Sequence, residues 1–260
     1  MNRIDRIFKT LRAEKRCGLV AYVTCGDPSP SATTAIVGAL ADAGADIIEL
    51  GVPFSDPIAD GPVIQAAAQR ALRAGTTTDD VFRVAREVRA QRDVGLVAFS
   101  YLNPILRYGA ERFARDAAAA GIDGVLLTDL PPEAAKELRA IFRAHGIGVT
   151  FLLAPTSLDA RVAAIDKASD GFIYYVSTTG VTGTRDDLDP ALLGRLDEIR
   201  GRLKKPVAVG FGISRREHYE LLRDHCDAIV VGSAIVRAVN DGDAAGAADR
   251  AAAVVRAIVG

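Results

Sequence analysis

The chain has 260 residues, 49% of them hydrophobic and 25% charged, with a formal net charge of -1. This length allows one large domain or two small ones, and the composition is typical of a globular protein with a full core. A near-neutral charge argues against a nucleic-acid-binding surface, which is usually strongly basic.

The N-terminal sequence, the lack of a long apolar run and the spacing of the cysteines favour a cytoplasmic protein without a metal site. The N-terminus is charged from Arg3 onward and carries no apolar secretory region, and no apolar run is long enough to span a bilayer. Cys17, Cys25 and Cys226 have no metal-type spacing, and the three histidines form no motif with them. We therefore expect free thiols in a reducing compartment, and no metal site or membrane partner.

An amphipathic helix is predicted over residues 2–14, where apolar side chains recur at helical spacing and Asn2 can cap the first turn. The chain then repeats a pattern of apolar strand, polar loop and Ala-rich helix. Strands are predicted over 19–24, 46–50, 95–100, 124–128, 148–153, 171–176, 206–210 and 228–231. Helices are predicted over 31–43, 63–74, 78–91, 110–120, 133–145, 158–168, 190–203, 215–224 and 244–259.

This alternation predicts the fold class, α/β, and within it a single-domain (β/α)₈ TIM barrel over residues 1–260 with extra helices. Eight strands within one domain length fit a closed barrel better than an open doubly wound sheet. No GxGxxG follows the first strand, which weakens a dinucleotide-binding alternative. One extra helix follows Pro62, and the leading helix is expected to close the barrel floor.

Two acids flank the end of the second predicted strand. Glu49 ends an apolar run, and Asp60 follows in a loop that Pro53 and Pro57 should stiffen. A carboxylic acid in an apolar setting has a raised pKa and can exchange protons near neutral pH. The alternative is that Glu49 is a buried structural acid and Asp60 a solvated turn residue.

Two further regions resemble binding elements. The stretch 177–187 is long and rich in Gly and Thr, which favours a lid, although a surface loop has the same composition. The seventh and eighth strands end in Gly210-Phe211-Gly212 and Gly232-Ser233. Glycines at these two ends suggest a phosphate site, because backbone N–H groups at a helix start bind anions. Tight turns that pack helices on the barrel are the alternative.

Eight motifs, in order, resemble the tryptophan synthase alpha subunit family over essentially the whole chain. They are GDPSP (26–30), ELGVPFSDPIADGPVIQ (49–65), YLNPILRYG (101–109), TDLPPEA (128–134), LLAPTS (152–157), YYVSTTGVTGTR (174–185), VGFGIS (209–214) and VVGSAIV (230–236). The resemblance implies a carbon–carbon lyase of tryptophan biosynthesis that cleaves indole-3-glycerol phosphate to indole and glyceraldehyde 3-phosphate.

The resemblance also assigns roles to residues. Glu49 matches the catalytic glutamate, which delivers a proton to indole C3, and Asp60 matches the aspartate that accepts the indole N–H. The matched phosphate-binding positions are Gly183, Phe211, Gly212, Gly232 and Ser233. The matched indole-pocket positions are Tyr22, Ile64, Phe99, Tyr101, Leu126, Tyr174 and Phe211, for each of which core packing is the alternative. Thr182 in the lid is expected to meet the Asp60 loop on closure.

The family's partner is a beta subunit that uses pyridoxal phosphate, so the resemblance implies an alpha2beta2 heterotetramer with no cofactor in this chain. By the same resemblance, residues 53–60, 103–104 and 129–132 face that partner, and indole passes to it directly. Two other functions remain open: another phosphate-binding barrel lyase or isomerase, and a non-catalytic subunit that activates a beta partner.

Overall fold

The computed structural model describes residues 2–176, 190–210 and 212–260, and its strands are all parallel to their neighbours. Their order is β5-β4-β3-β2-β1-β9-β8-β7-β6. They are β1 (Gly18–Thr24), β2 (Ile47–Gly51), β3 (Gly95–Ser100), β4 (Gly124–Leu127), β5 (Gly148–Thr150), β6 (Leu152–Leu153), β7 (Ile173–Val176), β8 (Val207–Gly210) and β9 (Ala228–Val231).

The sheet closes on itself through one divided strand. β5 pairs with β4, and β6, two residues further on, pairs with β7. Phe151 lies between them, and its carbonyl accepts a hydrogen bond of 3.0 Å from the backbone N of Tyr174. Strands in a barrel are staggered, so one extended run can pair with each neighbour over a different half. The predicted closed barrel is confirmed, with the strand over 148–153 divided in two.

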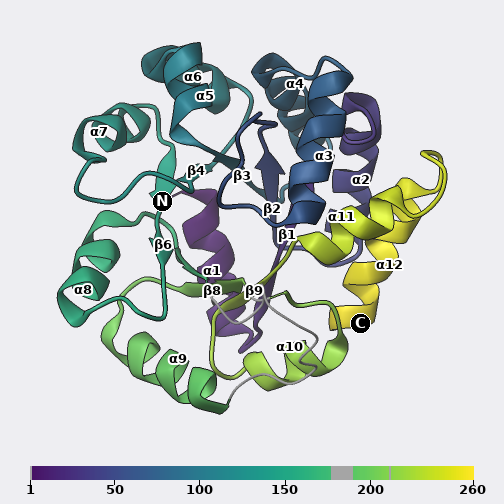
Figure 1. The fold of residues 1–260 in the computed structure, drawn as a ribbon. Helices are drawn as coiled ribbons and strands as arrows, with labels where there is room; N and C mark the ends of the chain where they lie inside the picture. Colours follow the sequence, from purple (N-terminus) through teal and green to yellow (C-terminus); the bar gives the residue numbers. More distant parts are fainter. Residues whose placement is uncertain (1, 177–189, 211) are drawn as a thin grey trace.

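Helices surround the strands, and α1 lies across the middle of that ring (Figure 1). They are α1 (Arg3–Ala13), α2 (Pro30–Asp42), α3 (Pro62–Arg73), α4 (Thr78–Arg89), α5 (Leu102–Tyr108), α6 (Ala110–Ala119), α7 (Lys136–Ala144), α8 (Asp159–Ala168), α9 (Pro190–Arg202), α10 (Arg216–Leu222), α11 (Ser233–Asn240) and α12 (Ala247–Val259). The predicted helices end within three residues of these bounds.

The sequence prediction was wrong about α5. No helix was predicted between the strand over 95–100 and the helix over 110–120, but the structure places Pro104 in the first turn of a helix that begins at Leu102. Proline is tolerated there because the N–H that it lacks has no partner within the helix. A pair such as Asn-Pro therefore fits a turn and a helix start equally well.

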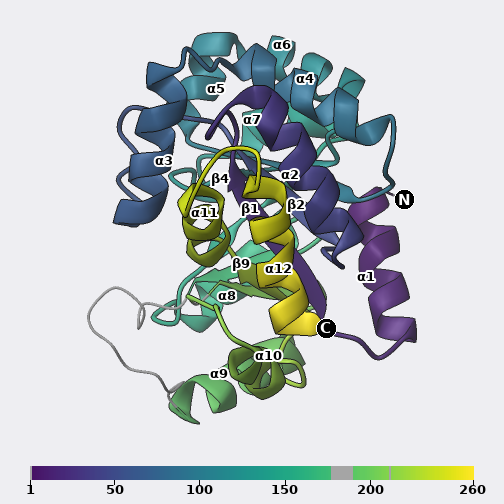
Figure 2. The same ribbon diagram turned by 90° about the vertical axis from the view of Figure 1, so that its right-hand side faces the viewer.

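Helix α1 closes the N-terminal end of the barrel, as expected for the leading helix. Ile4, Phe8 and Leu11 of α1 belong to one buried cluster with inward-facing side chains of the strands. The strand members are Val20, Ile47, Val97, Leu126, Ala208, Ala228 and Val230, and Phe172 joins them from just before β7. Figure 2 shows α1 along one end of the molecule, on the side away from α3. The floor is therefore closed, and the opposite, C-terminal strand ends are available for a site.

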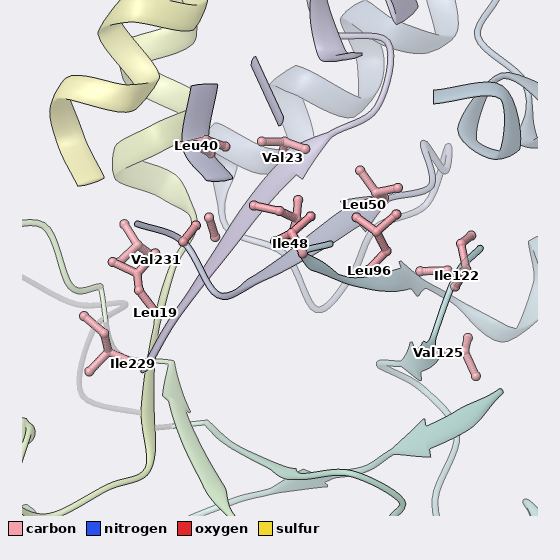
Figure 3. Close-up of a cluster of buried hydrophobic side chains, with 14 of the residues drawn as sticks. Leu19, Val23, Leu40, Ile48, Leu50, Leu96, Ile122, Val125, Ile229 and Val231 are labelled. Carbon is pink, nitrogen blue, oxygen red and sulfur yellow. The ribbon is translucent and has the colours of Figure 1, made fainter. Parts of the chain in front are cut away.

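A second apolar layer lies between the strands and the surrounding helices (Figure 3). Leu19, Ile48 and Leu96 point outward from β1, β2 and β3 into this layer, where Leu40 of α2 packs. Side chains alternate between the faces of a strand, so Ile47, Glu49 and Gly51 face inward where Ile48 and Leu50 face outward.

Within the described parts of the chain, none of the helices combines the length and the apolar character needed to cross a membrane.

Candidate active site

Glu49 is a completely buried acid inside the barrel. It lies in β2 opposite Tyr22 of β1 and has 0% exposed surface. Among the described residues, neither of its carboxyl oxygens has a hydrogen-bond partner. Burial raises the pKa of Glu49 to about 8. A buried polar group without a partner is costly, so this position indicates a group kept for chemistry.

Asp60 lies in the loop between β2 and α3 and is held by Tyr101. The Tyr101 hydroxyl donates a 3.1 Å hydrogen bond to Oδ2 of Asp60 and accepts one of 2.9 Å from the backbone N of Ala59. Phe54 packs against the Tyr101 ring at 5.2 Å between centroids. Burial raises the pKa of Asp60 to about 6, and the Tyr101 hydrogen bond partly opposes that rise.

A small pocket at the C-terminal strand ends brings the acid loop and the aromatic side chains together. Its lining comprises Tyr22, Thr24, Val52, Pro53, Phe54, Pro57, Asp60, Ala68, Phe99, Ser100 and Tyr101. Tyr22 and Phe99 meet edge to face at 5.2 Å. The structure therefore brings together Asp60 and three of the predicted indole-pocket residues.

Tyr174 is placed near both acids. It lies in β7 beside the interior cluster. Burial raises its pKa, and the nearby charges of Glu49 and Asp60 raise it further. Leu126 is fully buried in the same cluster, where core packing accounts for its position.

The predicted phosphate positions that the structure describes follow the ends of β8 and β9. Gly232 precedes α11, and Ser233 is the first residue of that helix. A Cβ at Gly232 would lie 3.5 Å from Cβ of Tyr22 and 3.8 Å from Cδ1 of Ile64. Gly212 has a φ of +60°, which favours glycine, and open space beside its Cα. Backbone N–H groups of α11 therefore begin next to the pocket, where they can bind an anion.

Three predicted positions lie outside the described residues: Thr182, Gly183 and Phe211. The lid and one side of the predicted phosphate site therefore remain sequence predictions.

The sequence prediction missed the role of two glycines on the strands. A Cβ at Gly51 would overlap the Tyr22 hydroxyl, and a Cβ at Gly210 would overlap the Tyr174 hydroxyl. Both glycines make room for an aromatic wall residue on the adjacent strand. An isolated Gly inside a strand can signal such a close approach, but it does not identify the partner.

The comparisons with known proteins agree over the whole chain. The family model described as tryptophan synthase alpha chain matches residues 8–258. The chain belongs to this family. The tryptophan synthase alpha chain of Solibacter usitatus is 51% identical over 239 residues, covering 92% of this chain and 90% of that one. That of Geobacter sulfurreducens is 49% identical over 237 residues, covering 91% and 90%.

Solved structures of the family share the fold. The alpha subunit of Legionella pneumophila strain Paris has a TM-score of 0.92 at 35% identity, covering 99% of this chain and 97% of that one. A chain from a tryptophan synthase a2b2 complex of Pyrococcus furiosus has a TM-score of 0.88 at 39% identity, covering 93% and 97%. The resemblance derived from the eight motifs is confirmed.

Among residues 2–176, 190–210 and 212–260, no three His, Cys, Asp or Glu side chains come together in a way that could hold a metal ion.

Proposed function

We propose that this chain cleaves indole-3-glycerol phosphate to indole and glyceraldehyde 3-phosphate, as a carbon–carbon lyase of tryptophan biosynthesis. Membership of the tryptophan synthase alpha chain family supports the reaction. The observation that carries the assignment of Glu49 is its complete burial without a partner among the described residues, with a pKa raised to about 8. Such an acid is protonated at neutral pH and can deliver that proton to carbon.

In the first proposed step, the Glu49 carboxyl protonates C3 of the indole ring. The positive charge that develops on the ring is stabilised by Asp60, which accepts the indole N–H. Because this charge exists only after C3 is protonated, Asp60 stabilises the transition state more than the substrate.

In the second step, the Glu49 carboxylate removes the proton of the glycerol hydroxyl next to the ring. The carbon–oxygen double bond of the aldehyde forms, the bond to C3 breaks, and its electron pair restores the aromatic indole. Glu49 is protonated again at the end of the cycle, so one residue serves as acid and then as base.

The substrate is proposed to lie across the mouth of the barrel. Gly183, Phe211, Gly212, Gly232 and Ser233 would bind its phosphate, and Tyr22, Ile64, Phe99, Tyr101, Leu126 and Tyr174 would surround its indole. Thr182 would close over the site and exclude water.

A tryptophan synthase beta subunit is the proposed partner, in an alpha2beta2 heterotetramer with pyridoxal phosphate in the beta chain. The a2b2 complex named for the Pyrococcus furiosus structure supports this assembly. The proposed contact face comprises residues 53–60, 103–104 and 129–132, through which indole would pass. We propose a cytoplasmic location on the same basis, as expected for a biosynthetic enzyme whose cysteines are free.

The test is indole release by the purified chain from indole-3-glycerol phosphate. Glu49→Gln should lower kcat roughly 10²–10⁴-fold while phosphate binding is retained, and Asp60→Asn should be severely impaired. Asp56→Asn, an exposed acid in the same loop, is the matched control and should keep wild-type activity. Wild-type turnover in Glu49→Gln would contradict the assignment.

The two alternatives give different results in the same assay. Another barrel lyase or isomerase would release no indole from this substrate, with or without a beta subunit. A purely activating subunit would raise beta-subunit turnover but leave indole-3-glycerol phosphate intact.

A further inference from the structure

Two of the three cysteines lie together at the N-terminal strand ends, on the side of the barrel away from the candidate active site. Cys17 and Cys226 are 209 positions apart in the sequence, and their Sγ atoms are 3.8 Å apart. Cys17 immediately precedes β1 and Cys226 lies two residues before β9, where the backbone N of Gly18 donates to the carbonyl of Asp227 at 2.9 Å. The register of β1 and β9 continues to Cys17 opposite Asp227, so Cys226 is one position away along the neighbouring strand.

A cavity of about 270 Å³ gives access to this pair and is lined by both cysteines. Its basic lining residues outnumber its acidic ones: Arg12, Lys15, Arg16, Arg200 and Arg223 against Asp224 and Asp227. Arg16, Arg200 and Arg223 form ion pairs with carboxylates. For Arg12 and Lys15, the described part of the chain provides no side-chain partner. The cavity can therefore attract a small anion to the two sulfur atoms.

The two thiols are not equivalent. The adjacent Cys17 thiol and burial raise the pKa of Cys226, whose S–H donates to the carbonyl of Leu222 at 3.2 Å. Cys17 is also the more exposed residue, at 5% against 1%. The thiol that a reagent in the cavity can reach is the one that attacks it first. Cys17 is therefore the attacking thiol, and Cys226 is placed to resolve the product.

We propose that Cys17 and Cys226 form a redox-active dithiol, which anionic low-molecular-weight disulfides of the oxidised glutathione class convert to a protein disulfide through the basic cavity. The Cys17 thiolate attacks one sulfur of the reagent, forming a mixed disulfide and releasing one thiolate. The Cys226 thiolate then attacks Sγ of Cys17, forming the protein disulfide and releasing the second thiolate. The two thiol protons go to the two released thiolates, so the protein is oxidised and the reagent is reduced.

The first experiment equilibrates the folded chain with mixtures of oxidised and reduced glutathione, quenches it, alkylates it under denaturing conditions and determines its mass. Oxidation should remove two of the three alkylatable thiols and the mass of two hydrogen atoms, leaving Cys25 labelled. Three alkylatable thiols at every glutathione ratio would overturn the proposal, as would a disulfide that includes Cys25.

Single substitutions separate the two steps. In Cys226→Ala, the mixed disulfide on Cys17 cannot be resolved, so a stable glutathionyl adduct should accumulate. Cys25→Ala is the matched control, because Cys25 is equally buried but away from the cavity. It should still form the bridge, and no adduct in Cys226→Ala would contradict the order of attack.

The role of the cavity is tested by the rate. The double variant Arg12→Gln, Lys15→Gln should react with oxidised glutathione roughly tenfold more slowly than wild type. Its rate with the neutral hydroxyethyl disulfide should not change. Lys9→Gln removes an exposed charge of α1 that does not line the cavity and should leave both rates unchanged. Equal rates of wild type and double variant with oxidised glutathione would overturn the role of the cavity.

Thermal unfolding gives an independent measurement in the wild-type protein. A bridge between residues 209 apart constrains most of the unfolded chain, so its unfolding midpoint should rise by roughly 5–15 °C on oxidation. An unchanged or lower midpoint in fully bridged protein would show that the pair is strained rather than positioned for bonding.

Discussion

At the scale of single residues, the candidate site depends on two acids in different environments. Glu49 is enclosed by the barrel without a partner among the described residues, whereas Asp60 accepts a hydrogen bond from Tyr101. Burial therefore raises both pKa values, but further for Glu49, to about 8 against about 6. Near neutral pH the first acid holds a proton while the second is mostly ionised, as the proposed reaction requires.

These pKa values predict a bell-shaped pH dependence of kcat/KM for indole release. Activity should fall below about pH 6, where Asp60 becomes protonated, and above about pH 8, where Glu49 loses its proton. In Tyr101→Phe the hydrogen bond that lowers the pKa of Asp60 is absent, so the acidic limb should move to higher pH. The other titratable groups near Asp60 are Tyr22, Tyr174 and Glu49. The variant retains all three, so the shift reports the loss of the Tyr101 hydroxyl. An unchanged acidic limb would contradict the role of Tyr101.

Glu49 should also lower the free energy of unfolding of the chain as the pH rises. Its pKa in the folded chain, about 8, lies above the ordinary value of 4.5. Between these pH values the unfolded chain loses a proton that the folded chain retains, so the free energy of unfolding decreases. Glu49→Gln should therefore be more stable than wild type at pH 8, by roughly 4 kcal/mol, and this advantage should disappear toward pH 4.5. Denaturant unfolding across this range measures it, and a constant difference would contradict burial as the cause.

At the scale of elements, the pocket depends on strand positions that carry glycine and therefore have no side chain. The glycines of β2 and β8 leave space for tyrosine side chains from β1 and β7. Strand bounds and inward-facing positions follow from local patterns in the sequence. The match between each inward side chain and the glycine that makes room for it depends on strand pairing. Local sequence patterns do not contain this pairing.

Gly210→Ala should therefore damage the site more than the fold. The new Cβ displaces the Tyr174 hydroxyl from beside the two acids, so we expect kcat/KM to fall at least tenfold and the free energy of unfolding to drop by roughly 1–3 kcal/mol. Gly194→Ala in α9 is the control, because its Cβ meets no atom. It should stabilise the chain by roughly 0.5–1 kcal/mol without changing kinetics. Equal kinetic effects of the two variants would contradict the close-packing argument.

At the scale of the whole molecule, the barrel separates two chemically different ends. The candidate site lies at the C-terminal strand ends, and α1 together with the cysteine pair lies at the other end. Pairing of β1 with β9 joins the first and last strands, which supports our proposal that residues 1–260 are one domain.

An exposed apolar side chain predicts where the partner binds. Ile58, in the loop that carries Asp60, is 86% exposed, more than any other large apolar side chain among the described residues, and it lies in the proposed contact face. Ile58→Asp should weaken binding of the beta subunit at least tenfold, measured by titration calorimetry. Leu221→Asp, an exposed leucine of α10, is the matched control and should bind normally. Equal affinity of Ile58→Asp and wild type would exclude this loop from the contact.

The sequence by itself determined the kinds and order of the elements, the barrel, and the family. Apolar spacing, Gly and Pro act over a few residues, so they can be recognised without a structure, and the motif around Glu49 is long enough to be specific. Ambiguous pairs such as Asn103-Pro104 were the exception, because the same dipeptide fits a turn and a helix start.

Only the tertiary structure decided which groups meet. It enclosed Glu49 without a partner from the described residues, aimed the Tyr101 hydroxyl at Asp60, fitted Tyr22 over Gly51, and brought Cys17 to within 3.8 Å of Cys226. Each of these contacts joins residues far apart in the chain or depends on burial by many elements at once. Local sequence patterns contain no such information, because it arises only when the barrel closes.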